Sequence, residues 1–471
     1  MGWSTYAYQH GPWTIYELPA RQPLVARVQD SRTGRVGETV KLNAHACNYP
    51  PLSIYLFWLQ GAVWHALDSN VVTLQPPPHV AVRFGLQEPV SSRIVDTRAS
   101  RFADALPALV FDLFLAWGVA ALVRTLRPDR RGRLLAAIGF AITILAPPIF
   151  LDSAFWNQAD AWIACLLVWC LVFLMRERLA LAGVIYGAAL MTKPQAVLFA
   201  PVFIYVFLAL RFAPGGTWRR ALGLLKTAAV ALVVVAVIAA PFTISDARSA
   251  ANPDGALRWF KRSYLGTIGS EMYQRTTLSA FNLWWLDLLA HGTPQQRGDV
   301  QRFLDVETPV LGLSKAVIGK LLLGLAIVLA WVLCARKWRW AVESWPVCTF
   351  LILLAAFTLP TSVHERYIYY CIPLAIALAA SRPTWIAPLL ALLIVGTAEM
   401  TSFRWAGLSR IYAPDSAAKG VSILLAILTV LTLLYSYAVL IPKARRAEAG
   451  AQSSSGPRRR QPSSPPAARR R

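Results

Sequence analysis

Cysteine is scarce in this sequence, and the few that occur form no metal-binding or disulfide pattern. Only 6 of 471 residues are cysteine, and neither a CxxC pair nor a Cys/His cluster occurs. Five of the six lie in apolar runs, where a thiol behaves as a small hydrophobic group. The sequence therefore contains no recognisable zinc module or disulfide framework.

Charged residues are also few, and no polar stretch is long enough to fold as a separate soluble domain. Charged side chains make up 15% of the chain and hydrophobic ones 56%, with 18 tryptophans and a mean hydropathy of +0.46. This balance exceeds the usual apolar content of soluble globular domains. The sequence predicts an all-α, polytopic membrane protein.

The formal net charge is +23, but its distribution does not indicate a nucleic-acid partner. Basic residues are scattered through short loops between the apolar runs and through residues 442–471, with no soluble basic face or aromatic stacking module. Clustering of Lys and Arg in cytoplasmic loops is typical of membrane proteins. We therefore predict the membrane itself as a partner, and no nucleic acid.

Apolar runs predict a transmembrane helix bundle of about eleven spans. A helix needs about 17–25 apolar residues to cross a bilayer. The predicted spans are 103–123, 134–150, 158–175, 179–192, 195–211, 221–243, 314–335, 343–360, 367–381, 384–402 and 419–441.

Three regions follow from this pattern. Residues 1–102 are predicted as an extracytoplasmic loop region, in which 52–67 forms an interfacial helix. Residues 103–441 form the bundle, with a long extracytoplasmic loop at 244–313 that we expect to contain further helices. Residues 442–471 are predicted to be a disordered, basic cytoplasmic tail.

The short basic loops set the expected orientation, because Lys and Arg favour the cytoplasmic side. Alternating spans place on that side Arg124, Arg127, Arg130, Arg131, Arg133, Arg176, Arg178, Arg211, Arg219, Arg220, Arg336, Lys337 and Arg339. The unusual polar clusters between the spans then all fall on the extracytoplasmic face. We therefore expect them to form one site there, in the cell membrane.

The first polar cluster is the stretch LDSAFWNQADAW, at 151–162, with Asp152, Asn157, Gln158 and Asp160. Ionisable groups at this depth are costly and usually functional. The carboxylate pair could act as base and positioner, or hold a divalent cation. Alternatively, Asp152 or Ser153 caps a helix that begins near residue 154.

The second cluster is Lys193-Pro194-Gln195, at a helix junction broken by proline. A lysine on the extracytoplasmic face is a point-charge ligand for phosphate. The alternative is a lysine that extends its amine to the membrane edge without a partner.

The third cluster is His364-Glu365-Arg366-Tyr367, which brings an acid, a base and a guanidinium together at the start of a span. Arginine can bind phosphate through two parallel hydrogen bonds, and histidine can exchange a proton near neutral pH. The alternative is a helix start whose charges satisfy one another. With the lysine and the carboxylates, the cluster predicts a pocket for an anionic, phosphorylated ligand.

The order of these motifs resembles the GT-C superfamily of integral-membrane glycosyltransferases. The motifs are YPPL from Tyr49, NQAD at 157–160, KPQ at 193–195, LSAFNLWWL at 278–286 and HERY at 364–367. The nearest likeness is to bacterial relatives of the GPI-anchor mannosyltransferases, and the glucosyltransferases of dolichol-linked oligosaccharide are also similar. The likeness extends over about residues 1–440 of this sequence.

The resemblance implies transfer of a sugar, with mannose favoured, from a polyprenyl-phosphate-sugar donor to an extracytoplasmic lipid or glycan acceptor. It implies that His364 and Arg366 face the donor phosphate with Lys193 nearby, and that Asn157, Gln158, Gln195, Glu365 and Tyr49 line the substrate site. The family includes metal-dependent and metal-independent members, so a requirement for a divalent ion is possible here.

In the family a first span and a catalytic aspartate precede the Tyr-Pro-Pro motif, and here Asn48 stands directly before it. The expectation is that both lie upstream of a misplaced start. Otherwise Asp152 or Asp160 takes the catalytic role, or the chain is a non-catalytic subunit of a glycosylation complex. A transporter or flippase of lipid-linked sugars is the other alternative.

Overall fold

The structure of the protein is a computed structural model. It describes residues 2–17, 24–30, 36–42, 47–67, 71–75, 90–93, 98–156, 158–248, 255–266, 275–292, 312–402 and 419–441. The predicted tail at 442–471 lies outside the described residues.

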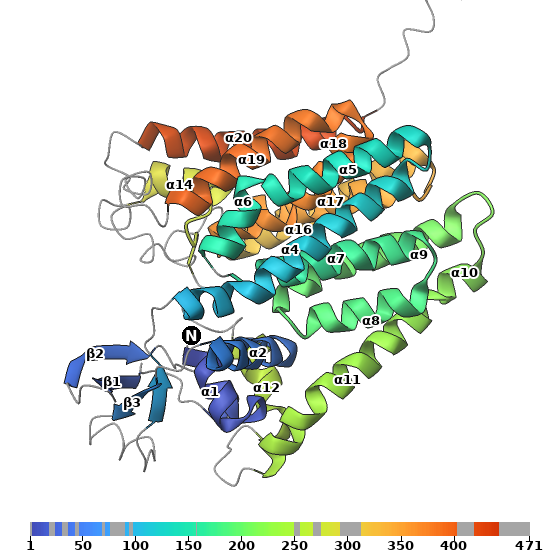
Figure 1. Cartoon of the computed structure of the whole chain (residues 1–471). Helices are drawn as coiled ribbons and strands as arrows, with labels where there is room; N and C mark the ends of the chain where they lie inside the picture. The colour runs from blue at the N-terminus through green and yellow to red at the C-terminus, as the bar shows by residue number, and fades with distance from the viewer. Residues whose placement is uncertain are drawn as a thin grey trace, which may run out of the picture.

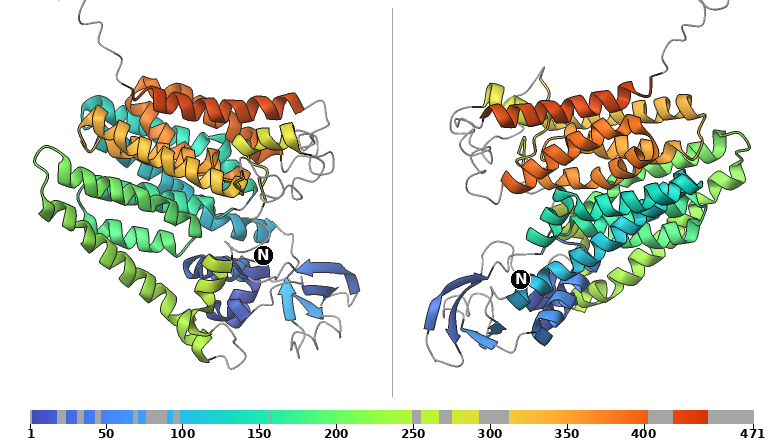
Figure 2. Two further views of the ribbon diagram at one scale, coloured as in Figure 1. Left: turned by 180° about the vertical axis from the view of Figure 1, so that it is seen from behind. Right: turned by 45° about the horizontal axis from the view of Figure 1, so that its top comes forward.

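Long apolar helices lie side by side and form the body of the molecule (Figures 1 and 2). Six of the described helical segments are long and apolar enough to span a membrane, or seven if one bent pair counts as a single span. They are Arg98–Leu126, Pro194–Phe212, Trp218–Arg248, Lys315–Trp338, Pro383–Thr401, Gly420–Ala438 and the bent pair Arg130–Leu145 with Pro147–Phe155. The predicted multi-pass helical membrane fold is confirmed.

Each of the eleven predicted spans coincides with a helix or with two consecutive helices, although several are short. The first six correspond to α4 (Arg98–Leu126), α5 and α6 (Arg130–Leu145, Pro147–Phe150), α7 (Asp160–Met175), α8 (Leu179–Leu190), α9 (Ala200–Phe212) and α11 (Leu224–Arg248). The remainder correspond to α16 (Lys315–Trp338), α17 (Ser344–Thr358), α18 (Ile372–Ser381), α19 (Ile386–Ser402) and α20 (Lys419–Ala438). Among these, α7, α8, α17 and α18 are too short to cross a membrane alone.

Proline and polar caps set several helix boundaries. Pro147 begins α6 after a 46° bend, because its ring cannot continue the preceding helix. Pro194 likewise begins the short helix η3 (Pro194–Phe199) directly after Lys193. At the other end of the bundle, the Asp129 carboxylate accepts a hydrogen bond from Gly132 N at 2.8 Å and caps α5. Polar site residues therefore lie where helices break.

Glycine brings α8 and α11 into close contact. A Cβ atom on Gly187 would lie 2.7 Å from the carbonyl oxygen of Ala231, and one on Gly183 would lie 2.5 Å from that of Thr227. Small residues four apart allow helix backbones to approach closely in membranes. The α8–α11 contact fixes the segment that leads into Lys193.

The first loop region folds at one end of the bundle and contains strands that the sequence did not predict. Helices α1 (Gly2–His10), η1 (Pro12–Glu17) and α2 (Pro51–Leu67) accompany a sheet in the order β2-β1-β3-β4. Its strands are β1 (Leu24–Asp30), β2 (Val36–Leu42), β3 (Val71–Gln75) and β4 (Val90–Arg93), all paired antiparallel. The sequence predicted a loop region and an interfacial helix here but no strands, because these short strands mix apolar and polar residues without a clear alternation.

Part of the loop after α11 also folds at this end. It contains η4 (Gly255–Leu257), α12 (Arg258–Phe260), η5 (Lys261–Leu265) and α14 (Leu283–His291). Buried Lys315 at the start of α16 donates a hydrogen bond to Asp287 on α14, which fastens that helix to the bundle. The predicted helices in this loop are present in its described parts.

Candidate active site

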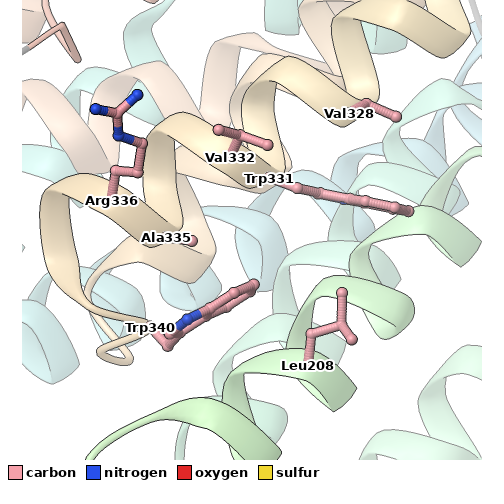
Figure 3. Close-up of a pocket in the computed structure, with 7 residues that line it drawn as sticks. All are labelled: Leu208, Val328, Trp331, Val332, Ala335, Arg336 and Trp340. Carbon is pink, nitrogen blue, oxygen red and sulfur yellow. The ribbon is translucent and has the colours of Figure 1, made fainter.

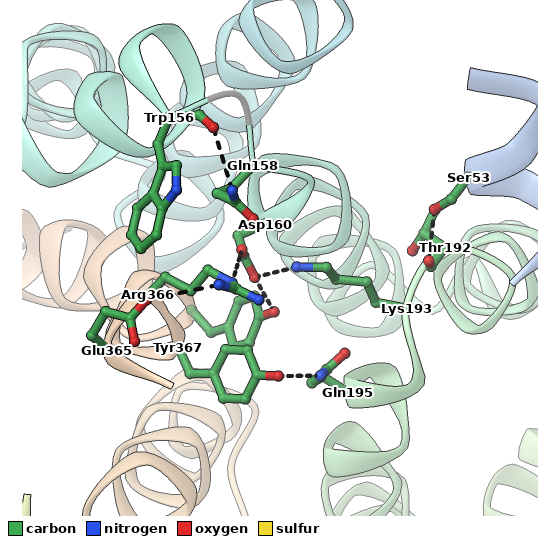
Figure 4. Close-up of polar contacts among 11 residues, drawn as sticks. Ser53, Trp156, Gln158, Asp160, Thr192, Lys193, Gln195, Glu365, Arg366 and Tyr367 are labelled. Atoms are coloured by element: carbon green, nitrogen blue, oxygen red, sulfur yellow. Dashed lines mark hydrogen bonds and ion pairs between the residues drawn. The ribbon is translucent and has the colours of Figure 1, made fainter. Parts of the chain in front are cut away.

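Three of the predicted polar motifs meet at a buried carboxylate (Figure 4). Lys193 Nζ donates a hydrogen bond to Asp160 Oδ1 at 2.8 Å, and Arg366 Nε lies 3.3 Å from Asp160 Oδ2. The Tyr370 hydroxyl also donates to Asp160 Oδ1. Residues from the start of α7, the break between α8 and η3, and the short helix η8 (Glu365–Tyr370) thus form one charged cluster, consisting of Asp160, Lys193, Glu365 and Arg366.

Lys193 does not extend to the membrane edge, so that interpretation of it was wrong. Its side chain is 4% exposed and paired with Asp160. The first loop region holds the preceding residues, because Leu52 N donates to Met191 O at 2.8 Å and Ser53 Oγ to Thr192 O at 2.6 Å. The amine also lies 5.9 Å from the centre of the Tyr49 ring. The Tyr-Pro-Pro-Leu motif therefore positions the lysine.

Arg366 is the cation of the cluster that keeps an accessible face. Its side chain is 18% exposed, and its guanidinium lies 3.7 Å from Glu365 Oε1 and 5.7 Å from the centre of the Trp156 ring. Burial disfavours the charge, but Asp160, Tyr367 and Glu365 more than compensate and hold the pKa of Arg366 above its usual range. The guanidinium is permanently charged and can contact a ligand.

His364 lies at the same opening, with a side chain 16% exposed and Nδ1 3.6 Å from Glu365 Oε2. Burial lowers the pKa of His364 below its ordinary value of 6.5, and nearby Arg366 and Lys193 act in the same direction against Glu365. The imidazole is therefore neutral near pH 7.

The backbone around His364 is held by the LSAFNLWWL motif. Leu278 N donates to Val363 O at 3.2 Å, and both Leu278 and Ser279 form β-bridges with His364. Further along the motif, the Asn282 side chain donates to Phe357 O at 3.1 Å, and Trp284 Nε1 donates to Leu359 O at 2.6 Å. This motif supports the HERY loop and does not itself supply a charged group.

The predicted amide residues flank the charged cluster. Gln195 Nε2 donates to the Tyr367 hydroxyl at 2.6 Å, which joins the second and third motifs again. Gln158 Nε2 donates to Trp156 O at 3.3 Å. Asn157 lies outside the described residues.

Asp152 lies beside the cluster and does not cap a helix, so the capping interpretation was wrong. Its side chain is fully buried in the short turn η2 (Leu151–Phe155), and neither carboxylate oxygen has a hydrogen-bond partner. Ser153 also does not cap α7, since its hydroxyl donates to Ile149 O at 2.8 Å and to the carboxylate of Asp112.

Asp112 on α4 is the residue that the sequence analysis missed. It accepts a hydrogen bond from the Tyr369 hydroxyl at 2.7 Å in addition to the one from Ser153. It thereby joins α4 to the turn that carries Asp152 and to the helix that carries Arg366. The sequence did contain an indication of its importance, because Asp112 lies in the middle of the predicted span 103–123. An acidic side chain inside a membrane is energetically costly unless it has a partner.

Among the described residues, no group of three or more His, Cys, Asp or Glu side chains could hold a metal ion. The carboxylates of Asp160 and Asp112 are instead bonded to cations or hydroxyl groups.

Comparison with protein families gives one match. Residues 39–253, just under half of the chain, match the ALG6, ALG8 glycosyltransferase family. The resemblance to GT-C membrane glycosyltransferases is confirmed. The matched segment contains Tyr49, Asp160 and Lys193 and ends before the HERY loop, so the wider likeness over residues 1–440 stays a prediction. No curated protein matches the chain.

Solved structures of the oligosaccharyltransferase from Archaeoglobus fulgidus are weakly similar. The apo form has a TM-score of 0.40 and 13% identity over 93% of this chain and 51% of that chain. The complex of that protein, AglB, with an inhibitory peptide and a dolichol-phosphate has a TM-score of 0.39 and 13% identity over 93% and 51%. This chain spans about half the length of those chains, and scores this low support no argument from them.

Proposed function

We propose that this protein is a GT-C glycosyltransferase that moves a sugar from a polyprenyl-phosphate-sugar donor to a lipid or glycan acceptor. The observation that carries the proposal is the charged cluster, in which Lys193 and Arg366 share Asp160 at a break between membrane helices. Paired buried cations with one accessible guanidinium suit a phosphate that must leave as an anion. The family match supports sugar transfer in general.

Arg366 is the residue we assign to the donor phosphate, because it retains an exposed face. Neutral His364 beside it can donate one N–H to a phosphate oxygen. Lys193 is almost fully buried, so we assign it a positioning role through Asp160. Gln195, Glu365 and Tyr49 surround these groups and are proposed to line the substrate site with Gln158.

In the proposed reaction, the acceptor hydroxyl oxygen forms a bond to the anomeric carbon on the side opposite the phosphate. The bond from that carbon to the phosphate oxygen breaks, and the lipid phosphate leaves with the electron pair. A carboxylate takes the hydroxyl proton. Asp152 is our candidate in this chain, since both of its oxygens lack a hydrogen-bond partner. It is covered in this structure, so acceptor binding has to uncover it.

Several finer features of the proposal rest on the motif resemblance and on the charge pattern. Mannose is the favoured sugar. The arginine-rich helix ends are proposed to face the cytoplasm, which places the charged cluster on the extracytoplasmic face of the cell membrane.

Transfer from a labelled donor tests the proposal. The purified full chain, supplied with radiolabelled polyprenyl-phosphate mannose and membrane extract, should transfer label to an acceptor. Parallel reactions with glucose, galactose and arabinose donors test the sugar. We expect H364A and R366A variants to lose at least about tenfold in rate, as for loss of a charge-assisted contact.

The matched control is R220A, which removes an exposed arginine paired with Glu177 at the opposite end of the bundle. It should transfer at the wild-type rate. Equal rates in R366A and R220A would refute the donor site. Movement of intact lipid-linked sugar across vesicles, without any transfer, would instead identify a flippase.

A further inference from the structure

A pocket lies between α9 and α16, at the arginine-rich end of the bundle (Figure 3). Its volume is about 410 Å³. Its walls are formed by Leu208, Val328, Trp331, Val332, Ala335, Arg336 and Trp340. The lining is apolar and aromatic except for the single arginine.

Trp340 closes the pocket because of the way α16 ends. Arg339 and Trp340 both adopt left-handed backbone conformations, with φ of 50° and 67°, which reverses the chain after the helix. The Trp340 ring then lies 5.5 Å from the Tyr205 ring and 6.1 Å from the Phe212 ring on α9. The reversal therefore builds an aromatic wall that bridges the two helices.

Arg336 supplies the only charge of the lining, and its side chain is exposed. Within the described part of the chain no hydrogen bond or ion pair engages its guanidinium. The neighbouring residue Lys337 does not line the pocket. Its amine donates a hydrogen bond to the carbonyl oxygen of Val439, directly after α20. The pocket thus combines an apolar cavity with one available cation at its rim.

This pocket is separate from the charged cluster. Helix α16 begins at Lys315, at the end of the bundle where α14 lies, and Arg336 is near its other end. Its 24 residues correspond to a length of about 36 Å. A ligand bound at Arg336 is therefore distinct from the donor phosphate that we propose to bind at Arg366.

We propose that this pocket binds an anionic phospholipid of the membrane leaflet at the arginine-rich end. The acyl chains occupy the space beside Val328 and Val332, and the phosphate accepts hydrogen bonds from Arg336. Charge complementarity supports this occupant, because basic pockets between membrane helices on the cytoplasmic side bind anionic head groups. Tryptophan side chains are also enriched at this depth of a membrane.

Lipid retention by the purified full chain tests the proposal. The protein is titrated in detergent with phosphatidylglycerol or phosphatidylcholine, and the bound lipid is counted by native mass spectrometry. We expect one phosphatidylglycerol to bind at least about tenfold more tightly than phosphatidylcholine, and R336Q to remove this difference. The control is R131Q, an exposed arginine at the same end on α5, which should retain it.

A second pair of variants tests the cavity. V332W fills the pocket, whereas L321W places the same bulk on α16 seven residues before Val328, at a position 61% exposed and outside the lining. We expect V332W to release the phosphatidylglycerol and L321W to keep it. Equal binding of the two lipids by the wild type, or unchanged binding in both R336Q and V332W, would overturn the proposal.

Discussion

Lys193 and Asp160 form a direct ion pair of 2.8 Å between Nζ and Oδ1, although neither side chain is more than 4% exposed. Asp160 begins α7, whereas Lys193 lies in the break between α8 and η3, and Arg366 approaches the other oxygen of the same carboxylate. Asp160 therefore balances buried Lys193 and partly buried Arg366, and the stability of the site depends strongly on this acidic group.

Replacement of Asp160 by Asn should be strongly destabilising. The variant leaves Lys193 and Arg366 buried without their common counter-charge, and loss of one partner of a buried pair typically costs about 3–5 kcal/mol. Thermal unfolding in detergent measures the change. The control E177Q removes an acid that is 58% exposed and paired with Arg220, and should cost less than about 1 kcal/mol. Similar losses in the two variants would contradict the central role of Asp160.

A double-mutant cycle should show that Asp160 and Lys193 act together. K193M leaves Asp160 with Arg366 and Tyr370, so it should be destabilising alone. Once D160N is present, removing the lysine also removes an unpaired buried charge, so the second change should cost less or even stabilise the protein. Additive losses in unfolding free energy would show that the two side chains do not interact.

Much of the bundle could be predicted from sequence, because apolar runs and arginine-rich loops report directly on membrane helices. The motifs also identified Asp160, Lys193 and Arg366 individually. Their common contact could not be predicted, since a lysine at a helix junction has the same local pattern whether it reaches outward or inward. Spatial pairing depends on how α7, α8 and η8 pack.

Two further features escaped prediction for different reasons. Asp112 has no polar neighbours in the sequence, and its partners Ser153 and Tyr369 are 41 and 257 residues away. The sheet of the first loop region is built from short strands of mixed composition, and it includes pairing between β1 and the distant β3. Both features arise from tertiary contacts that a single sequence does not display.

Loss of the Tyr369 hydroxyl should affect transfer as well as stability. Y369F removes the hydrogen bond to Asp112 that connects η8 to α4, at a cost of about 1–2 kcal/mol. Y437F is the matched control, because the Tyr437 hydroxyl makes a buried bond to Ala326 O at 2.8 Å near the arginine-rich end. We expect similar losses of stability but reduced sugar transfer in Y369F alone. Equal rates in both variants would show that Asp112 does not position the HERY helix.

The protonation of His364 should be visible in the pH dependence of stability. Its pKa is lowered by burial, so the unfolded chain takes up the proton first as pH falls through about 6.5. Stability from this group is therefore complete above pH 6.5 and decreases as pH falls toward the lowered native value. Unfolding of the wild type and H364Q between pH 5 and 8 measures it. The difference between the two proteins should change across this window, and a constant difference would contradict the lowered pKa.

Gly187 should tolerate no side chain, because α8 and α11 are in backbone contact there. A methyl group would lie 2.7 Å from Ala231 O and 2.9 Å from Val234 Cβ, so the helices would have to separate. Overpacking of this kind typically costs about 1–3 kcal/mol. G324A on α16 is the matched control, since nothing lies within 4 Å of its added Cβ and alanine favours a helix by about 1 kcal/mol. We expect the melting temperature to fall in G187A and to stay or rise in G324A. Because α8 leads directly into Lys193, G187A should also reduce sugar transfer at temperatures where the protein remains folded, and wild-type stability and transfer in this variant would show that the close contact is not required.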